Sequence, residues 1–177
     1  MTFKYIYPSI HDHLLIFILL ILVGIWADVK AVDAQSSSVY GPQGGNVGLW
    51  GPQLAWRGGS FNSVGFFHSQ NERNPWLKIK LNRAVVISFV TITNRYDGDG
   101  SRLSNIEIRG GMKNDLANPV IGNFQGPGQR GLVYQIQVTP TKVLYLSFQR
   151  KVNYGVLQIN GIKVGFAKGK STLYVTV

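Results

Sequence analysis

The strongest constraint on the fold is a succession of short β-branched and aromatic runs, separated by glycine, proline, asparagine and aspartate. No stretch after residue 35 keeps a helical period of apolar residues. The runs that we expect to be strands cover residues 76–81, 84–93, 103–109, 132–138, 142–149 and 156–164. Many strands at short spacing are typical of a β-sandwich or jelly roll, so the sequence predicts an all-β fold.

Two adjacent runs show how the expected strands divide their side chains between two faces. In residues 76–81 the apolar side chains of Leu77 and Ile79 alternate with lysines. In residues 84–93 we expect Val86, Val90 and Ile92 to share one face. Residues that favour turns connect the runs, among them Asn82-Arg83, Asp97 to Gly100, Gly126-Pro127-Gly128 and Thr139-Pro140-Thr141.

The first 34 residues read as an export signal. Residues 14–26 (LLIFILLILVGIW) are apolar without a break, but a bilayer span takes about 20 residues. A run of this length is typical of a secretory signal peptide. Val32-Asp33-Ala34 reads as the cleavage site, with Val29-Lys30-Ala31 as a second option. We therefore expect a secreted, extracellular protein, and the alternative is an uncleaved signal anchor.

The rest of the chain divides into a domain at residues 35–165 and a short end at residues 166–177. Residues 36–65 are rich in Gly, Ser, Asn and Pro, and they include Trp50 and Trp56. Two tryptophans are a large apolar surface to leave in water, so we expect an ordered loop over the core. We interpret residues 166–177 as either an added edge strand or a tail.

The chain has no cysteine and a formal net charge of +10. The missing cysteines exclude disulfides, thiol catalysis and Cys-ligated metal sites, so the fold must depend on burial alone. Removal of the first 34 residues takes away two lysines and three aspartates, which raises the formal net charge to +11. This charge favours an acidic partner, but it does not choose among nucleic acid, anionic glycan and anionic lipid.

A loop between two expected strands carries the residues that indicate a binding site. Arg95, Asp97 and Arg102 lie close together in the sequence, so one carboxylate stands between two guanidinium groups. Each arginine offers a planar fork of donors whose charge is permanent, and the carboxylate can hold both forks in place. Such a rigid array suits the neighbouring hydroxyls of a sugar. His68 precedes Arg95 with 26 residues between them.

These four positions, written H-x26-R-x-D-x4-R, resemble the sugar-binding motif of the F-type lectins, a fucose-binding family. Asn74-Pro75-Trp76 is similar to the family's NPWW segment. Residues 90–95 resemble the strand that leads into the motif, and residues 102–109 resemble the strand that leaves it. The resemblance covers about residues 37–164, which is nearly the whole expected domain.

The resemblance implies a galactose-binding-like β-sandwich that holds fucose in loops at one end. It implies that His68, Arg95 and Arg102 hydrogen-bond the ring oxygen and hydroxyls of fucose. Asp97 would brace the arginines, and Phe61 would lie beside the fucose methyl group. The implied function is recognition of fucosylated glycans, in innate immunity or in recognition between gametes or cells. One monosaccharide site binds weakly, so homo-oligomers or clustered presentation would supply avidity.

The sequence departs from the F-type lectin pattern at two places. The family's adjacent cysteines, which form a vicinal disulfide against the sugar, are replaced by Gly98-Asp99. The family's calcium-binding segment resembles residues 55–58, where Arg57 replaces a carboxylate ligand, and Asn160-Gly161 replaces a later Cys-Glu pair. Calcium takes several oxygen ligands. We therefore expect the calcium site to be lost or much weakened, with no other metal or cofactor.

Other functions fit the residues less well. Asp97 and Glu107 could form a glycosidase pair, but the two arginines would hold Asp97 as an anion, so no enzyme is expected. The main alternative is a basic discoidin-like module that binds anionic glycan or phospholipid surfaces after loss of fucose specificity. Nucleic acid is not an expected partner, because the protein is expected to be exported.

Overall fold

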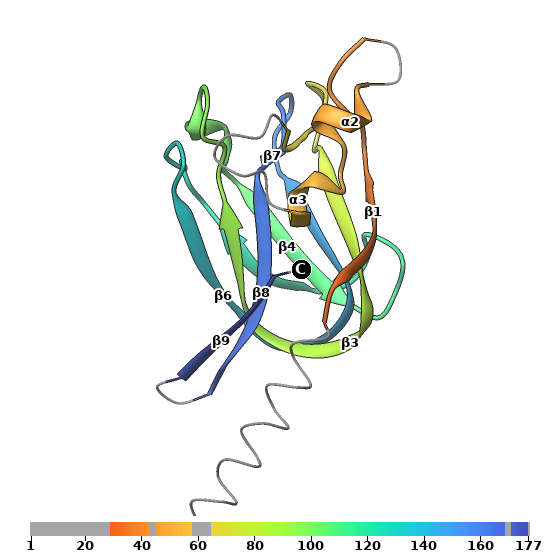
Figure 1. Cartoon of the computed structure of the whole chain (residues 1–177), viewed down its shortest axis with the longest axis vertical. Coiled ribbons are helices and arrows are strands. Elements are labelled where there is room, and N and C mark those ends of the chain that lie inside the picture. The colour runs from red at the N-terminus through yellow and green to blue at the C-terminus, as the bar shows by residue number, and fades with distance from the viewer. Residues whose placement is uncertain (1–28, 43–44, 58–64, 169–170, 177) are drawn as a thin grey trace, which may run out of the picture.

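The structure is a computed structural model that describes residues 29–42, 45–57, 65–168 and 171–176. Strands make up most of it, which confirms the all-β prediction (Figure 1). The elements are β1 (Ala31–Ser36), α2 (Val47–Trp50), α3 (Leu54–Arg57), β2 (Phe67–His68), β3 (Trp76–Thr93), the 3-10 turn η1 (Gly100–Arg102), β4 (Ile106–Gly111), β5 (Val120–Phe124), β6 (Val133–Arg150), β7 (Gln158–Ile159), β8 (Gly161–Lys168) and β9 (Ser171–Thr176).

Two long strands, β3 and β6, form the centre of one antiparallel sheet with the order β5-β4-β6-β3-β8-β9. The first part of β3 also pairs with β1, and its last part pairs with β8. Because β3 and β6 curve through their length, the sheet folds into two layers around a common core (Figure 1). The short pair β2–β7 lies near the end where the loops gather.

Two of the expected turns are wrong, because they lie inside continuous strands. β3 runs through Asn82-Arg83, and β6 runs through Thr139-Pro140-Thr141. The pairing of β3 with β6 shifts register at both places, between Lys80 and Val85 and again between Ile87 and Phe89. A bulge adds a residue to one strand and tolerates proline, so the chain bends there without ending the strand.

The second register shift also corrects the expected faces of residues 84–93. Val86 is exposed, whereas Val85 and Ile87 are buried before the shift. After the shift Val90 and Ile92 are buried. Across this shift β6 advances four residues, from Thr141 to Gln137, while β3 advances two, from Ile87 to Phe89, so the regular alternation of faces is interrupted. Phe89 and Thr91 are buried there as well. The strand β3 therefore contributes side chains from both odd-numbered and even-numbered positions to the core.

The core lies between the two layers and contains fully buried phenylalanine, leucine and isoleucine side chains. The largest include Phe67, Leu77, Ile79, Leu81, Ile92, Ile108, Leu146 and Phe148. Leu77 and Ile79 share the buried face that their alternation predicted. Close packing of this kind accounts for a stable sandwich without disulfides.

The strand β1 lies where sequence analysis expected a cleavage site. Ala31 to Ser36 pair with β3 in antiparallel register, and the Val29 side chain is 2% exposed within the core. The Lys30 amide donates to the Asn82 side chain at 3.0 Å. Cleavage after Ala34 would remove most of this strand. The expected boundary stays a prediction, and the sheet favours one before Val29.

The two ends of the expected domain carry further elements. Part of residues 36–65 forms the short helices α2 and α3, with Trp56 packed against the core. At the other end, β9 pairs with β8 as an edge strand, which was one of the two interpretations of residues 166–177. Among the described residues, no helix has the length and apolar character needed to span a membrane.

Candidate functional site

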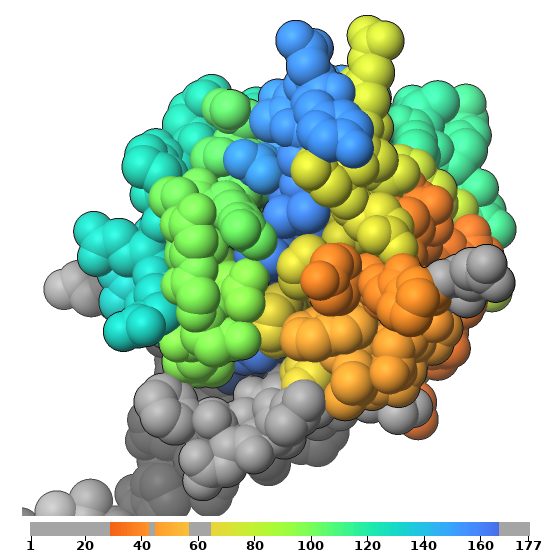
Figure 2. All heavy atoms as spheres, turned by 90° about the horizontal axis from the view of Figure 1, so that it is seen from above, coloured from red at the N-terminus to blue at the C-terminus, as the bar shows by residue number. Residues whose placement is uncertain are grey.

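The predicted site residues come from segments that meet at one end of the sandwich. Figure 2 views this end, where the segments around residues 40–57, 65–75, 94–103 and 150–160 lie side by side. His68 comes from β2, whereas Arg95, Asp97 and Arg102 come from the loop between β3 and β4. Phe61, the fifth predicted residue, lies outside the described residues.

Arg95 is fixed by a carboxylate on one side and an aromatic ring on the other. Its Nη2 and Nε lie 3.1 and 3.3 Å from the two carboxylate oxygens of Asp97. Its guanidinium carbon lies 5.0 Å from the ring centre of Phe66. The Arg95 side chain is 11% exposed, whereas Asp97 is 68% exposed. A two-point ion pair together with a cation–π contact holds the guanidinium in one orientation.

Gly98 makes this position of Arg95 possible. Its φ of +66° lies in the left-handed region that side chains other than glycine rarely adopt. A Cβ atom at Gly98 would lie 2.9 Å from Nη2 of Arg95. The residue that replaces the first of the family's cysteines is therefore required by the local backbone and by the close approach of the guanidinium.

Arg102 pairs with Asp99 and not with Asp97, which corrects the expectation that one carboxylate braces both arginines. Nε of Arg102 lies 3.6 Å from Asp99, and the arginine side chain is 45% exposed. Asp99 is the N-cap of the turn η1, and its side chain accepts hydrogen bonds from the amide and hydroxyl of Ser101. These hydrogen bonds, more than the charge of Arg102, lower the pKa of Asp99. Each arginine has its own carboxylate.

His68 is buried with both ring nitrogens engaged. Nδ1 lies 2.6 Å from the carbonyl oxygen of Ser69, and Nε2 lies 2.5 Å from the amide nitrogen of Gln158. In a neutral ring, Nδ1–H donates to Ser69 and Nε2 accepts from Gln158. Burial lowers the pKa of His68, and the nearby positive charges of Arg95 and Arg102 act in the same direction. The ring is therefore a neutral, fixed part of the site.

Three aromatic rings surround His68. Tyr40 lies 4.5 Å from it between ring centres, Trp50 lies 5.7 Å away, and Phe66 lies 6.0 Å away. Tyr40 is 47% exposed, and its amide donates to the carbonyl of His68 at 2.8 Å. An exposed ring beside fixed donors can contact the apolar face of a sugar.

A buried asparagine connects the arginine loop to its neighbour. The side-chain amide of Asn94 donates to the carbonyls of Gly100 and Gln129, at 2.8 and 2.9 Å. The amide of Gly131 donates to the carbonyl of Arg95 at 2.7 Å. These bonds order a loop that has no disulfide, because buried polar groups need partners.

Sequence reasoning missed Tyr40 and Gln158, and it gave Asp99 no role. Tyr40 and Gln158 lie 28 and 90 residues from His68 in the sequence and belong to no motif, so no local pattern could have found them. From the sequence alone, Asp99 is only a residue that stands where the family has a cysteine. Its position three residues before Arg102 was a usable indication of an ion pair.

The described residues offer little to a calcium ion. Within them, no group of three or more histidine, aspartate or glutamate side chains is placed to hold a metal. Asn160, which replaces a member of the family's Cys-Glu pair, is buried between β7 and β8, and its backbone amide donates to the carbonyl of Thr93 at 3.0 Å. The residues do not fit the ion, and the loss of the calcium site stays a prediction.

Comparison with known proteins finds a galactose-binding-like domain family and fucolectins similar to this chain. The family model described as "NedA-like, galactose-binding domain" matches residues 59–148. A fucolectin of Anguilla anguilla is 41% identical over 63 residues, which are 32% of this chain and 40% of the eel protein. These matches confirm the resemblance to the F-type lectins.

Solved structures show the same fold. A fucolectin from the serum of Morone saxatilis, the striped bass, matches 79% of this chain with a TM-score of 0.64 and 24% identity. A fucose-binding module of Streptococcus pneumoniae matches 75% of this chain and 89% of its own, with a TM-score of 0.57 and 20% identity. The chain spans less than half of the eel and bass proteins, at 40% and 47% of their lengths.

Proposed function

The chain belongs to the family of NedA-like galactose-binding domains, and from this we propose that it is a lectin that binds fucosylated glycans through His68, Arg95, Asp97 and Arg102. The single observation that carries the proposal is the fixed guanidinium of Arg95, held by Asp97 and Phe66 beside the buried His68. The fucolectin and fucose-binding relatives support fucose as the sugar.

The site has the two kinds of surface that a fucose ring needs. Arg95 and Arg102 supply charged donors for ring and hydroxyl oxygens, each worth roughly 1.5–3 kcal/mol. Tyr40 supplies an exposed aromatic ring for the apolar edge of the sugar. Because both ring nitrogens of His68 are already hydrogen-bonded, to Ser69 and Gln158, we propose that the uncharged ring positions the ligand by packing against it. A direct bond from Nε2 to the sugar requires the Gln158 amide to turn away.

We also propose export to the extracellular space, as for the bass fucolectin, which comes from serum. The apolar run at residues 14–26 supports an export signal. The pairing of β1 and the burial of Val29 support a mature protein that begins at or before Val29. Several copies presented together would raise the avidity of a weak monosaccharide site.

A glycan array with free fucose as competitor tests the function. Wild-type protein is expected to bind fucosylated glycans and to lose them to free fucose. Arg95→Ala is expected to weaken binding by about tenfold to a hundredfold, since a charged donor contributes roughly 1.5–3 kcal/mol. Arg130→Ala, at an exposed arginine of the neighbouring loop, is the matched control and should bind like wild type. Array binding that ignores both free fucose and Arg95→Ala would contradict the proposal.

The alternative, a basic module for anionic surfaces, gives a different result in the same assay. Binding through net charge falls steeply as salt is raised, because the contacts are screened. Fucose-dependent binding through a partly buried arginine should change little between 0.1 and 0.3 M salt, at Debye lengths of about 10 Å and below. Strong salt dependence without fucose competition would favour the anionic-surface function.

A further inference from the structure

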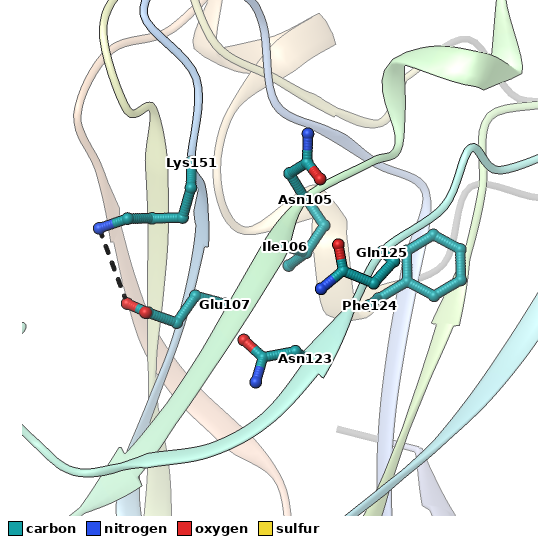
Figure 3. Close-up of a pocket in the computed structure, with 7 residues that line it drawn as sticks. All are labelled: Asn105, Ile106, Glu107, Asn123, Phe124, Gln125 and Lys151. Carbon is teal, nitrogen blue, oxygen red and sulfur yellow. Dashed lines mark ion pairs between the residues drawn. The ribbon is translucent and has the colours of Figure 1, made fainter.

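A pocket lies on the outer face of strands β4 and β5, away from the four motif residues (Figure 3). Glu107 and Asn123 are paired across these strands, and the neighbouring Ile106 and Ile108 point into the core. The pocket has a volume of about 360 Å³, within the range of small-molecule sites. Its polar lining residues are Asn105, Glu107, Asn123, Gln125 and Lys151.

Backbone hydrogen bonds around Asn105 join the three segments that form the pocket. Asn105 has a φ of +53°, and its amide donates to the carbonyl of Gln125 at 2.9 Å. Its carbonyl accepts from the amide of Lys151 at 2.8 Å. These two backbone hydrogen bonds hold the segments of Gln125 and Lys151 against Asn105. The wall of the pocket is therefore held in place by the backbone.

The charged side chains at the pocket form ion pairs with one another. The carboxylate of Glu107 lies 2.7 Å from Nε of Arg109 and 3.8 Å from Nζ of Lys151, and its side chain is 17% exposed. Figure 3 shows the Lys151–Glu107 pair at one edge of the residues that line the pocket. A pocket with paired charges is a poor match for a free anion or cation, because binding either would break an existing ion pair.

The remaining polar groups suit hydroxyls. Within the described part of the chain, no hydrogen bond is made by the side-chain amides of Asn105, Asn123 and Gln125. The amide ends of Asn123 and Gln125 point toward the space in front of Glu107 (Figure 3). Each amide is both donor and acceptor, as is each sugar hydroxyl. The ring of Phe124 packs on Tyr134 at 4.6 Å and so does not offer its face to an aromatic ligand.

Arg150 is close to both the pocket and the arginine site. Arg150, which precedes Lys151, donates to the hydroxyl of Ser104 at 3.1 Å, and Ser104 precedes Asn105. Burial lowers the pKa of Arg150, and the charge of Arg102 lowers it further. Arg150 thus contacts the residue before the pocket wall and lies close enough to Arg102 to be affected by its charge.

We propose that this pocket is a second sugar-binding site, for an uncharged pyranose. The sugar is either the next unit of the fucosylated glycan at the arginine site or part of a separate neutral glycan. The choice of a sugar as the ligand rests on the proposed function. The match to an uncharged sugar rests on the side chains of Asn123, Gln125 and Glu107.

Calorimetric titration of the full chain separates these sources, with L-fucose, a fucosylated tetrasaccharide and lactose as ligands. The double variant Asn123→Ala/Gln125→Ala should lose about fivefold to a hundredfold in affinity for the tetrasaccharide or for lactose, since two neutral hydrogen bonds are removed. Its affinity for L-fucose should be unchanged. Gln137→Ala, at an exposed amide on β6, is the matched control and should bind all three ligands like wild type.

The outcomes separate the two proposals. A loss confined to the tetrasaccharide supports a subsite for the same glycan, and a loss confined to lactose supports a separate glycan. Unchanged affinity for both, with fucose binding intact, overturns the pocket proposal. The protein could instead bind lactose through Asn123 and Gln125 and show no binding of fucose. That result would support the pocket proposal and contradict the proposed function.

Discussion

His68 and Gln158, which lie 90 residues apart in the sequence, meet with 2.5 Å between their side-chain nitrogens. The contact joins β2 to β7 at the base of the candidate site. Together with the bond from His68 to Ser69, it leaves a neutral imidazole no free nitrogen. The histidine of the motif therefore acts as part of a packed structure, and its protonation is coupled to folding.

The pH dependence of stability should reveal this coupling. Burial lowers the pKa of His68 from its ordinary value near 6.5. As pH falls below about 6.5, His68 becomes protonated in the unfolded chain but stays neutral in the folded protein. The free energy of unfolding therefore decreases. Thermal midpoints between pH 7.5 and 5 should drop more for wild type than for His68→Gln, which has no proton to bind there. Parallel curves for the two proteins would contradict the coupling.

Gly98 should be intolerant of any side chain, for two separable reasons. Gly98→Ala combines a left-handed φ of +66° with a Cβ 2.9 Å from Arg95, so we expect a loss of about 1–3 kcal/mol in stability and weaker fucose binding. Gly98→Asn tolerates the backbone better but keeps the steric contact. Asparagine should therefore recover stability without recovering affinity. Denaturant unfolding and fucose titration measure the two effects, and wild-type affinity in Gly98→Asn would show that the contact is harmless.

The two aspartates should differ in their effect on binding. Asp97→Asn removes the two-point pair that orients Arg95, whose side chain is mostly buried. Asp99→Asn keeps an amide that can still cap η1, and it frees an arginine that is already half exposed. We expect about a twofold to fivefold loss of fucose affinity for Asp97→Asn, since exposed pairs are worth up to about 1 kcal/mol. Asp99→Asn should change affinity less, and the reverse order would contradict the assignment.

The first strand should be part of the mature protein. A chain that begins at Gln35 lacks Val29 and most of β1, whereas one that begins at Val29 keeps both. Burial of a valine alone contributes about 1.5–3 kcal/mol, so the shorter chain should unfold at a lower temperature. Mass spectrometry of secreted protein should find the N-terminus at or before Val29. A secreted, equally stable protein that begins at Gln35 would show that β1 is dispensable.

Chelation should leave the protein unchanged. The described residues include no cluster of acidic side chains able to hold a metal, and Arg57 replaces an expected ligand. The thermal midpoint should therefore be the same with and without EDTA, measured at constant ionic strength. A thermal midpoint that falls sharply on chelation and recovers when Ca²⁺ is added would contradict this prediction and show that the protein keeps the family's calcium site.

Local sequence patterns predicted much of the fold but could not predict its bulges. Alternation in residues 76–81 identified the buried face of Leu77 and Ile79, because a strand's period of two is a local property. Thr139-Pro140-Thr141 has the composition of a turn, yet it lies inside β6 opposite a register shift of β3. Whether a short polar segment turns or bulges depends on the partner strand, which the local sequence does not specify.

The sequence by itself determined the all-β class and the four motif positions, because strand periodicity and the spacing of charged residues are written along the chain. It also placed Arg95 and Asp97 two residues apart, where they could pair. Only the tertiary structure decided that Arg102 pairs with Asp99, that Gln158 and Tyr40 contact His68, and that β1 completes the sheet. These contacts join segments far apart in the sequence, or choose between equally near partners, and that choice is made when the loops and strands pack together.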